Sequence, residues 1–302
     1  MKIIHTSDWH IGKIINEFSM IDDQKHILDE FIKLLDNEKP DAIIIAGDIY
    51  DRSIPPVEAI ELLNDTLIKI VIDRKIKVLA ISGNHDSSER LSFGSDILEK
   101  NGLYLVGNTY NLFKKVTLKN DDEIVNFYLV PYKNPSSVRN ISNDEKIKTH
   151  NDAMDYIVKN IKEDINKNEV NIIVCHGYVS NFKSFEELET SESERRLSIG
   201  GTDLIDVNIF DDFDYVALGH LHKAQKVKRK EVRYSGTLLK YSFSEVNNKK
   251  SVTIIDIKNK DINIKLEHLK SLRDMRILEG NIDDILKEGI NSTFGRDDYL
   301  KV

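Results

Sequence analysis

The chain has 302 residues, of which 40% are hydrophobic and 31% charged, a composition typical of a soluble globular protein. Its net charge of −8 argues against a protein held on nucleic acid by bulk positive charge, although a local basic surface is not excluded. No apolar stretch approaches the roughly 18 residues that a membrane helix needs. The opening "MKIIHTSDWH" turns polar too early for a signal peptide, and a single cysteine, Cys175, excludes an internal disulfide, so we expect a cytoplasmic protein without a membrane partner.

Six short apolar runs, each followed by a polar or glycine-rich turn, are predicted to be strands. They are "KIIHTS", "AIIIAG", "KVLAISG", "NFYLVP", "NIIVCHG" and "DYVALGH". Between the first three runs, apolar side chains recur with helical spacing over residues 22–36 and 57–72. The second of these helices is apolar over so wide a stripe that we expect it to be covered by the sheet and by another subunit. Strands alternating with helices indicate an α/β fold with ligand sites at the carboxyl ends of the strands.

The second half of the chain is less regular. Residues 150–166 still have helical spacing, whereas residues 180–203 are charged enough to predict a long loop. Short strand-like pieces follow "DYVALGH", ending with "SVTIIDI", and they are typical of a hairpin meander. The character of the sequence changes again near residue 266.

Side chains that bind metals follow five of the predicted strands. In chain order these tips carry Asp8 and His10; Asp48 and Asp51; Asn84, His85 and Asp86; His176; and His220 and His222. Tips of neighbouring strands, about 4.8 Å apart, can converge on one site. Imidazole, carboxylate and amide ligands without thiolates suit Mn, Fe, Zn or Mg ions. These carboxylates, the amide and the imidazoles exceed the needs of one ion, so the sequence predicts a two-metal site.

Each motif alone has an ordinary structural explanation. An isolated D-x-H at a strand end has about one chance in ten of binding metal, and acidic residues are common in turns without any ligand. The G-N-H-D and G-H-x-H motifs are rarer. Because all of them occur in this order, each after a predicted strand, we favour the metal site over coincidence.

The series of motifs resembles the calcineurin-like metallophosphoesterases, whose fold is two packed mixed β-sheets flanked by helices. Within that superfamily the chain is similar to the SbcD family of DNA nuclease subunits over "MKIIHTSDWHIGK", "ISGNHDSSERLSFG", "FDYVALGHLHKAQ" and "RYSGTLLKYSFSE". The resemblance covers residues 1–258 well. It implies a nuclease domain over residues 1–265 and, over residues 266–302, the beginning of a small C-terminal capping domain that is cut short.

The resemblance also implies a role for each candidate residue. One ion is held by Asp8, His10, Asp48 and His222. Asp48 bridges to a second ion, which Asn84, His176 and His220 complete. His85 faces the scissile phosphate, with Asp86 orienting or tuning it, and Asp51 fixes the loop that presents Asp48. The implied cofactors are two divalent ions, Mn²⁺ in the first place and Mg²⁺ as the alternative.

The implied function is double-strand exonuclease and single-strand endonuclease activity in DNA repair and recombination. The implied partners are DNA, a coiled-coil ATPase of the SbcC type that docks through regions largely absent from this chain, and a second copy of the chain. We expect that homodimer to form through residues 57–72 and 89–100, with Leu63 and Leu67 as candidate contacts. Arg52, Lys223 and Lys226 are candidate DNA contacts, and the basic stretch 223–233 is either a DNA surface or a solvated hairpin.

Two other functions remain open. The metal motifs alone do not exclude a phosphoprotein phosphatase or a small-molecule phosphodiesterase of the same superfamily. A non-catalytic binding scaffold is the alternative of another class. The presence of every expected ligand and of His85 favours an enzyme.

Overall fold

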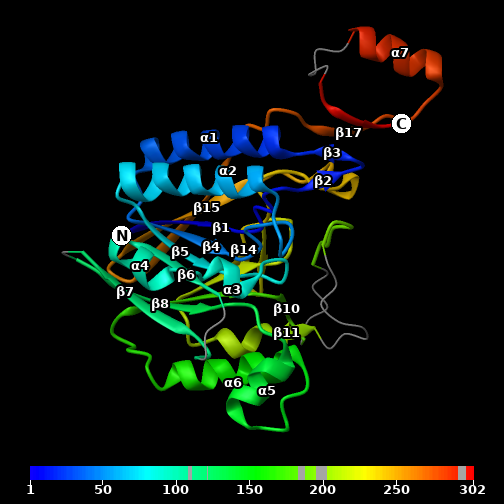
Figure 1. Ribbon diagram of the computed structural model, residues 1–302. Coiled ribbons are helices and arrows are strands. Elements are labelled where there is room, and N and C mark those ends of the chain that lie inside the picture. The colour runs from blue at the N-terminus through cyan, green and yellow to red at the C-terminus, as the bar shows by residue number, and fades with distance from the viewer. Residues whose placement is uncertain (108–110, 121, 183–187, 195–202, 292–296) are drawn as a thin grey trace.

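The computed structural model describes residues 1–107, 111–120, 122–182, 188–194, 203–291 and 297–302, and its centre is a pair of six-stranded sheets (Figure 1). The first has the order β16-β15-β1-β4-β5-β6 and the second β13-β14-β12-β9-β8-β7. In both, four neighbouring strands are parallel and the remaining strands are antiparallel. This confirms the predicted fold of two packed mixed sheets.

Each of the six predicted apolar runs forms a strand in one of these two sheets. The first sheet contains β1 (Lys2–Thr6), β4 (Ala42–Ala46), β5 (Lys77–Ile81), β6 (Leu103–Val106), β15 (Ser251–Lys258) and β16 (Asp261–His268). The second contains β7 (Lys114–Lys119), β8 (Ile124–Val130), β9 (Val170–His176), β12 (Tyr215–Gly219), β13 (Gln225–Val227) and β14 (Arg229–Tyr234). Three small pairs complete the strands: β2 (Ile14–Ile15) with β3 (Phe18–Ser19), β10 (Tyr178–Ser180) with β11 (Leu204–Asp206), and β17 (Met275–Ile277) with β18 (Tyr299–Lys301).

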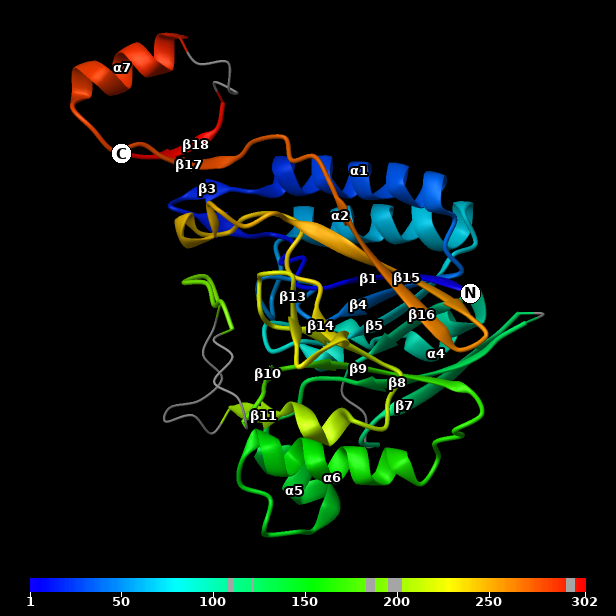
Figure 2. The same ribbon diagram turned by 180° about the vertical axis from the view of Figure 1, so that it is seen from behind.

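Helices cover the outer face of each sheet (Figures 1 and 2). On the first sheet lie α1 (Ile21–Glu38) and α2 (Val57–Leu67), which continues as the π-helix Ile68–Asp73. On the second lie α5 (Pro135–Ser142), α6 (His150–Lys162) and the 3₁₀ turn Val207–Phe210. The shorter helices are α3 (Ser88–Leu91), α4 (Ser95–Leu98) and the 3₁₀ turns Glu99–Asn101 and Phe243–Glu245, and α7 (Ile282–Asn291) lies apart from the sheets. No described helix is long and apolar enough to cross a membrane.

The alternation of side chains along the strands builds three apolar layers. In β4, Ile43 and Ile45 pack outward with Phe31 of α1, whereas Ile44 packs between the sheets with Val174 of β9. A third cluster joins the outer face of the second sheet to α6. Because the inner strands are buried on both faces, they read as continuous apolar runs in the sequence.

The expected hairpin meander after residue 220 is only partly correct. β13 and β14 form an antiparallel hairpin, but β14 then pairs parallel with β12, and β15 crosses to the first sheet. There β15 lies antiparallel to β1, with Ile3 opposite Ile255. Its first five residues are all buried, so the strand fits a place beside β1 better than a solvated meander.

The second helix is oriented differently from the prediction. Leu63 is only 5% exposed and belongs to the core on the first sheet, and Leu67 packs against that core. Leu63 is therefore not available for contact with a partner. Val57, at the start of the segment, is an exposed apolar side chain, and so are Ile60, Ile68 and Ile72, which recur at multiples of four residues.

Candidate metal centre

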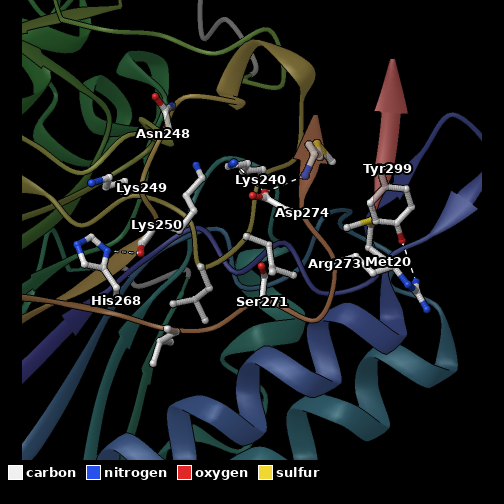
Figure 3. Close-up of a pocket in the computed structure, with 14 residues that line it drawn as sticks. Met20, Lys240, Asn248, Lys249, Lys250, His268, Ser271, Arg273, Asp274 and Tyr299 are labelled. Atoms are coloured by element: carbon white, nitrogen blue, oxygen red, sulfur yellow. Dashed lines mark hydrogen bonds and ion pairs between the residues drawn. The ribbon is translucent and has the colours of Figure 1, made fainter. Parts of the chain in front are cut away.

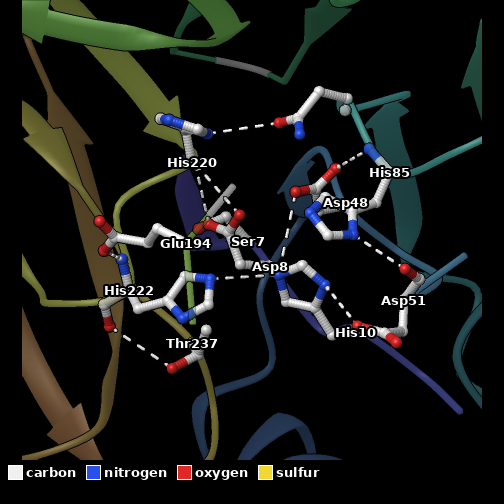
Figure 4. A network of polar contacts seen from close by, with 12 residues as sticks. Ser7, Asp8, His10, Asp48, Asp51, His85, Glu194, His220, His222 and Thr237 are labelled. Carbon is white, nitrogen blue, oxygen red and sulfur yellow. Dashed lines mark hydrogen bonds and ion pairs between the residues drawn. The ribbon is translucent and has the colours of Figure 1, made fainter. Parts of the chain in front are cut away.

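Four of the seven candidate ligands have backbone conformations that are uncommon for residues other than glycine. Asp8, His10 and Asp48 have φ values of 53°, 45° and 49°, and His220 has a φ of 111°. Non-glycine residues with positive φ are uncommon, and such strain is typical of functional sites because the surrounding structure must hold it. The turns bring side chains from β1, β4 and β12 back over the carboxyl edge of the two sheets (Figure 4).

A close approach of the two sheets shapes the centre. Gly219, at the end of β12, lies so near β4 that a Cβ atom added to it would be 1.9 Å from the carbonyl oxygen of Ala46. The same oxygen accepts a hydrogen bond from Nδ1 of His176 at 2.9 Å. This bond leaves the Nε2 lone pair of His176 available for a metal.

The first group of ligand atoms comprises Asp8, His10 and His222, all within 4.8 Å of one another and all buried. Nε2 of His10 is 3.2 Å from Nε2 of His222 and 3.8 Å from Oδ2 of Asp48. Two imidazole nitrogens directed at one point beside carboxylates are the arrangement that a divalent ion needs.

The second group surrounds the other side of Asp48. Oδ1 of Asn84 is 2.8 Å from Nε2 of His176 and 3.3 Å from Nδ1 of His220. Oδ2 of Asp48 is 3.4 Å from the same nitrogen of His176. This single oxygen thus lies between both groups, at the position a bridging ligand would take. The structure brings all seven predicted ligands together.

His85 lies beside the centre but is held differently from the prediction. Its Nδ1 donates to the carbonyl oxygen of Asp51 at 2.8 Å, and its backbone N–H donates to Oδ1 of Asp48 at 2.8 Å. Asp86 instead accepts hydrogen bonds from the backbone N–H groups of Ile49, Tyr50 and Gly83. In the described residues, the carbonyl oxygen of Asp51 thus contacts the His85 ring, and Asp86 joins the loop of Asp48 to the loop of His85. The role expected for Asp86 stays a prediction.

Asp51 also has a role in the loop that carries it. Its Oδ1 accepts from Nζ of Lys13 at 2.8 Å and lies 3.6 Å from Nδ1 of His10. His10, Asp51 and His85 form a further group of possible ligand atoms within 4.8 Å. The hydrogen bond from His85 and the ion pair with Lys13 agree with the expectation that Asp51 fixes this loop.

Burial controls the charges of the centre. It raises the pKa of Asp8 to about 7 and lowers the pKa of His220 to about 3. Burial also lowers the pKa values of His10 and His222, so these rings are neutral and can offer lone pairs. Burial opposes the ionisation of Asp48 and His176, but their mutual attraction outweighs it: the pKa of Asp48 lies well below its usual value and that of His176 rises to about 9. A bound cation would replace the proton of His176.

Sequence reasoning missed the residues behind His222. Nδ1 of His222 is 2.7 Å from Oγ of Ser193 and 3.2 Å from Oε1 of Glu245, and its backbone N–H donates to Oε1 of Glu194 at 2.7 Å. Ser193 and Glu194 belong to the charged loop predicted over residues 180–203, and Glu245 ends the quoted segment "RYSGTLLKYSFSE". No spacing rule connects these residues with a histidine so far away in the chain.

The candidate DNA contacts are less uniform than predicted. Arg52 has a side chain 58% exposed, with Nε 3.6 Å from Oδ2 of Asp51. Lys223 forms an ion pair with Glu189, and Lys226 is exposed on β13. Their positions are compatible with DNA contacts, so all three stay candidates for that role.

The basic stretch does not lie beside the metals as a whole. Because β14 is parallel to β12, the start of β14 lies at the sheet edge opposite the carboxyl end of β12, where His220 follows. Lys228 pairs there with Asp211, and Arg229 and Lys230 with Glu231. Arg233 is buried. The part of this stretch that could contact DNA near the centre is therefore its beginning, residues 223–227.

The donor set fits two divalent ions. It consists of four imidazoles, two carboxylates and the amide of Asn84, and all of these side chains except the half-buried Asn84 are buried. Hard and borderline divalent ions prefer such nitrogen and oxygen ligands.

Comparisons with known proteins identify the family of this chain. A model of the calcineurin-like phosphoesterase family matches residues 1–224. The SbcD subunit of the SbcCD nuclease from Staphylococcus epidermidis is 40% identical over 291 residues, which are 96% of this chain and 75% of the relative. The protein of the same name from Staphylococcus saprophyticus is 41% identical over 288 residues, 95% of this chain and 74% of the relative.

A solved structure, TT1561 of Thermus thermophilus, has the same fold. It has a TM-score of 0.51 at 11% identity and covers 89% of this chain and 99% of its own. The two sequence relatives and the family model carry the assignment further than this likeness does. The chain belongs to the calcineurin-like phosphoesterases and, within them, to the SbcD family of nuclease subunits.

Proposed function

We propose that this chain is a two-metal DNA nuclease that hydrolyses phosphodiester bonds, as a double-strand exonuclease and a single-strand endonuclease, together with a coiled-coil ATPase of the SbcC type. The observation that supports this most is the convergence of seven candidate ligands, from five strand ends, around Oδ2 of Asp48. The two relatives, both named as part of the SbcCD nuclease, support DNA as the substrate and the ATPase as the partner.

The proposed ligand sets follow the two groups. Asp8, His10, Asp48 and His222 would hold one ion, and Asp48 would share the other with Asn84, His176 and His220. When bound, such an ion pair lowers the pKa of a water molecule between the ions and neutralises charge on the phosphate. We assign Mn²⁺ to both positions, with Mg²⁺ as the alternative, because a mixed nitrogen and oxygen donor set suits Mn²⁺.

His85 is the proposed acid for the leaving oxygen. Its Nδ1–H is committed to the carbonyl of Asp51, so Nε2 is the atom free to exchange a proton with the substrate. The ring lies edge-on to that of His10, with 4.8 Å between the two centroids. It is therefore close to the first metal group, although His85 is not one of the proposed ligands. Asp86 supports this arrangement by joining the loops of Asp48 and His85.

We further propose a homodimer through the exposed face of α2 and its π-helical continuation. Ile60, Ile68 and Ile72 are 47%, 44% and 45% exposed, and apolar side chains repeated on one helix face are typical of helix–helix contacts. Phe93 and Ile97, 86% and 72% exposed, lie in the second segment predicted to take part.

Residues 266–302 are proposed to begin a capping unit. β16, the strand at the edge of the first sheet, ends at His268, close to the proposed boundary at residue 265. Arg273 and Tyr299 both contact Oδ2 of Asp23 on α1, which ties the β17–β18 pair to the main body.

The test of function is a substrate panel. Linear duplex DNA, single-stranded circular DNA, a p-nitrophenyl phosphodiester and a p-nitrophenyl phosphomonoester are each incubated with Mn²⁺, with Mg²⁺ and with chelator. We expect cleavage of both DNAs and of the diester with Mn²⁺, and none with chelator or in the Asp48→Ala variant. Equal cleavage in chelator contradicts the two-metal mechanism. Preference for the monoester favours a phosphatase, and inactivity on every substrate despite bound metal favours a scaffold.

A further inference from the structure

The two ring nitrogens of His222 have different surroundings. Nε2 points into the centre, 3.2 Å from Nε2 of His10. Nδ1 points away from it, toward Oγ of Ser193 and Oε1 of Glu245. Figure 4 shows the His222 ring beside that of His10. Only one nitrogen of a neutral imidazole carries a proton, so the groups at Nδ1 decide which nitrogen is free to bind metal.

The hydrogen bonds around Ser193 fix the direction of donation. Its Oγ is 2.6 Å from Oε1 of Glu245, and an ionised carboxylate can only accept. The hydroxyl group of Ser193 therefore donates its hydrogen bond to Glu245. Its oxygen accepts a hydrogen bond from Nδ1–H of His222, at an Nδ1–Oγ distance of 2.7 Å. Nδ1 is thereby the protonated nitrogen, and the lone pair of Nε2 is directed at the centre.

Lys250 keeps the carboxylate in place. Glu245 is fully buried, and its Oε2 accepts from Nζ of Lys250 at 2.6 Å. The same Nζ donates to the carbonyl oxygen of His222 at 2.9 Å and to Oγ1 of Thr237 at 2.7 Å, so all three of its protons have acceptors. A buried carboxylate without this partner would be costly, because its charge would be unpaired.

This support reaches His222 from three sides. Ser193 and Glu245 hold the ring, Lys250 holds the carbonyl oxygen, and Glu194 accepts the backbone N–H at 2.7 Å. The Lys250 side chain also lines a cavity of about 270 Å³ beside residues 268–275 (Figure 3). No other predicted ligand has so many side-chain partners among the described residues outside the centre.

We propose that Glu245 and Lys250 act through Ser193 as positioning residues that fix the tautomer and orientation of His222 for metal binding. This inference rests on the proposed two-metal function and adds the groups that prepare one ligand. Partners behind a metal-binding histidine typically contribute 10–100-fold to metal affinity. Without the acceptor, the His222 ring can rotate and exchange its proton between the two nitrogens.

Two double variants separate positioning from packing. Glu245→Leu with Lys250→Met removes the acceptor and its counterion together, which leaves no buried unpaired charge. Glu245→Gln with Lys250→Met restores an acceptor oxygen without the charge. We expect the first to bind the ion of the Asp8–His10–His222 group roughly 10–100-fold more weakly and the second to recover most of the affinity, with similar melting temperatures for both.

The tautomer itself is the direct readout. In metal-free protein labelled with ¹⁵N-histidine, the signals that vanish in His222→Ala belong to this ring. We expect Nδ1–H in the natural chain and in the glutamine variant, and a shift toward Nε2–H in the leucine variant. An Nε2–H tautomer in the natural chain would overturn the inference, as would unchanged metal affinity in the leucine variant. If that variant does not fold, Glu245→Met with Lys250→Met replaces it, because methionine keeps the length of the side chain without a carboxylate. The same tautomer shift is expected there, and an unchanged tautomer counts against the inference.

These readouts are independent of DNA cleavage. A chain with two bound ions and an Nδ1–H tautomer that cleaves no DNA would contradict the proposed function and leave the positioning inference standing. A chain that cleaves DNA but whose metal affinity does not depend on Glu245 would contradict the positioning inference and leave the proposed function standing.

Discussion

Replacing Gly219 with alanine should cost the centre an ion although every candidate ligand remains. The added Cβ would lie 1.9 Å from the carbonyl oxygen of Ala46, and ordinary contact begins at 3.4 Å, so β12 and β4 must separate by about 1.5 Å at this point. Overpacking of this kind costs about 1–3 kcal/mol. The same oxygen orients His176, and the new methyl would also lie 2.9 Å from Nδ1 of that ring. We therefore expect 10–100-fold weaker binding of the second ion.

Elemental analysis after dialysis and thermal melting are the assays. Gly219→Ala should retain about one ion instead of two, and melt several degrees lower at roughly 2–4 °C per kcal/mol. Gly177→Ala is the matched control: it also adjoins His176, but its new Cβ would meet only the end of the Ile205 side chain, at 3.1 Å. Two retained ions and an unchanged melting temperature in Gly219→Ala would refute the reasoning, because β12 would then not need its close approach to β4.

Three other outcomes are expected. His85→Asn should keep both ions and DNA affinity but lower the single-turnover rate by roughly 10²–10⁴-fold; a lost metal equivalent would identify His85 as a ligand. Because Asp48 raises the pKa of His176 to about 9 against the effect of burial, metal binding at pH 7.5 should release a proton. Calorimetric heats should then depend on the ionisation enthalpy of the buffer below pH 9 and less above it, and a buffer-independent heat at pH 7.5 would contradict this. Ile60→Glu with Ile68→Glu should give monomers in sedimentation, because these isoleucines are exposed on the proposed dimer face. The control Ile141→Glu, on α5, should not. An unmodified chain that is monomeric at micromolar concentration would count against the dimer.

The metal ligands could be found from the sequence because each follows an apolar run. A parallel strand buried on both faces is visible as such a run, and its carboxyl end is where polar side chains meet. Asp8, Asp48 and His176 were located by this rule. The partner of the His85 ring could not be found in the same way, since it is a backbone carbonyl, and every residue has one.

Contacts between distant segments account for the remaining errors. The stripe on α2 shows which side chains are apolar but not which part of the stripe meets the sheet, so Leu63 was assigned to the wrong side. The crossing of β15 to the first sheet depends on the free edge of β1, some 250 residues earlier, and no local pattern records it. Glu245 likewise reaches His222 through tertiary packing alone.

The position of β15 also has a consequence for how the polypeptide is made. The match to the family model ends at residue 224, yet β1 keeps an open edge until residues 251–258 arrive to pair with it. During synthesis, β1 is the first strand to emerge, and the N–H and C=O groups on one of its sides remain without their strand partner until almost the whole chain has been made. Such long-range pairing slows folding and leaves a strand edge open to association with other chains. A fragment that ended with the family match at residue 224 would therefore leave this edge of β1 without the partner strand that it has in the structure.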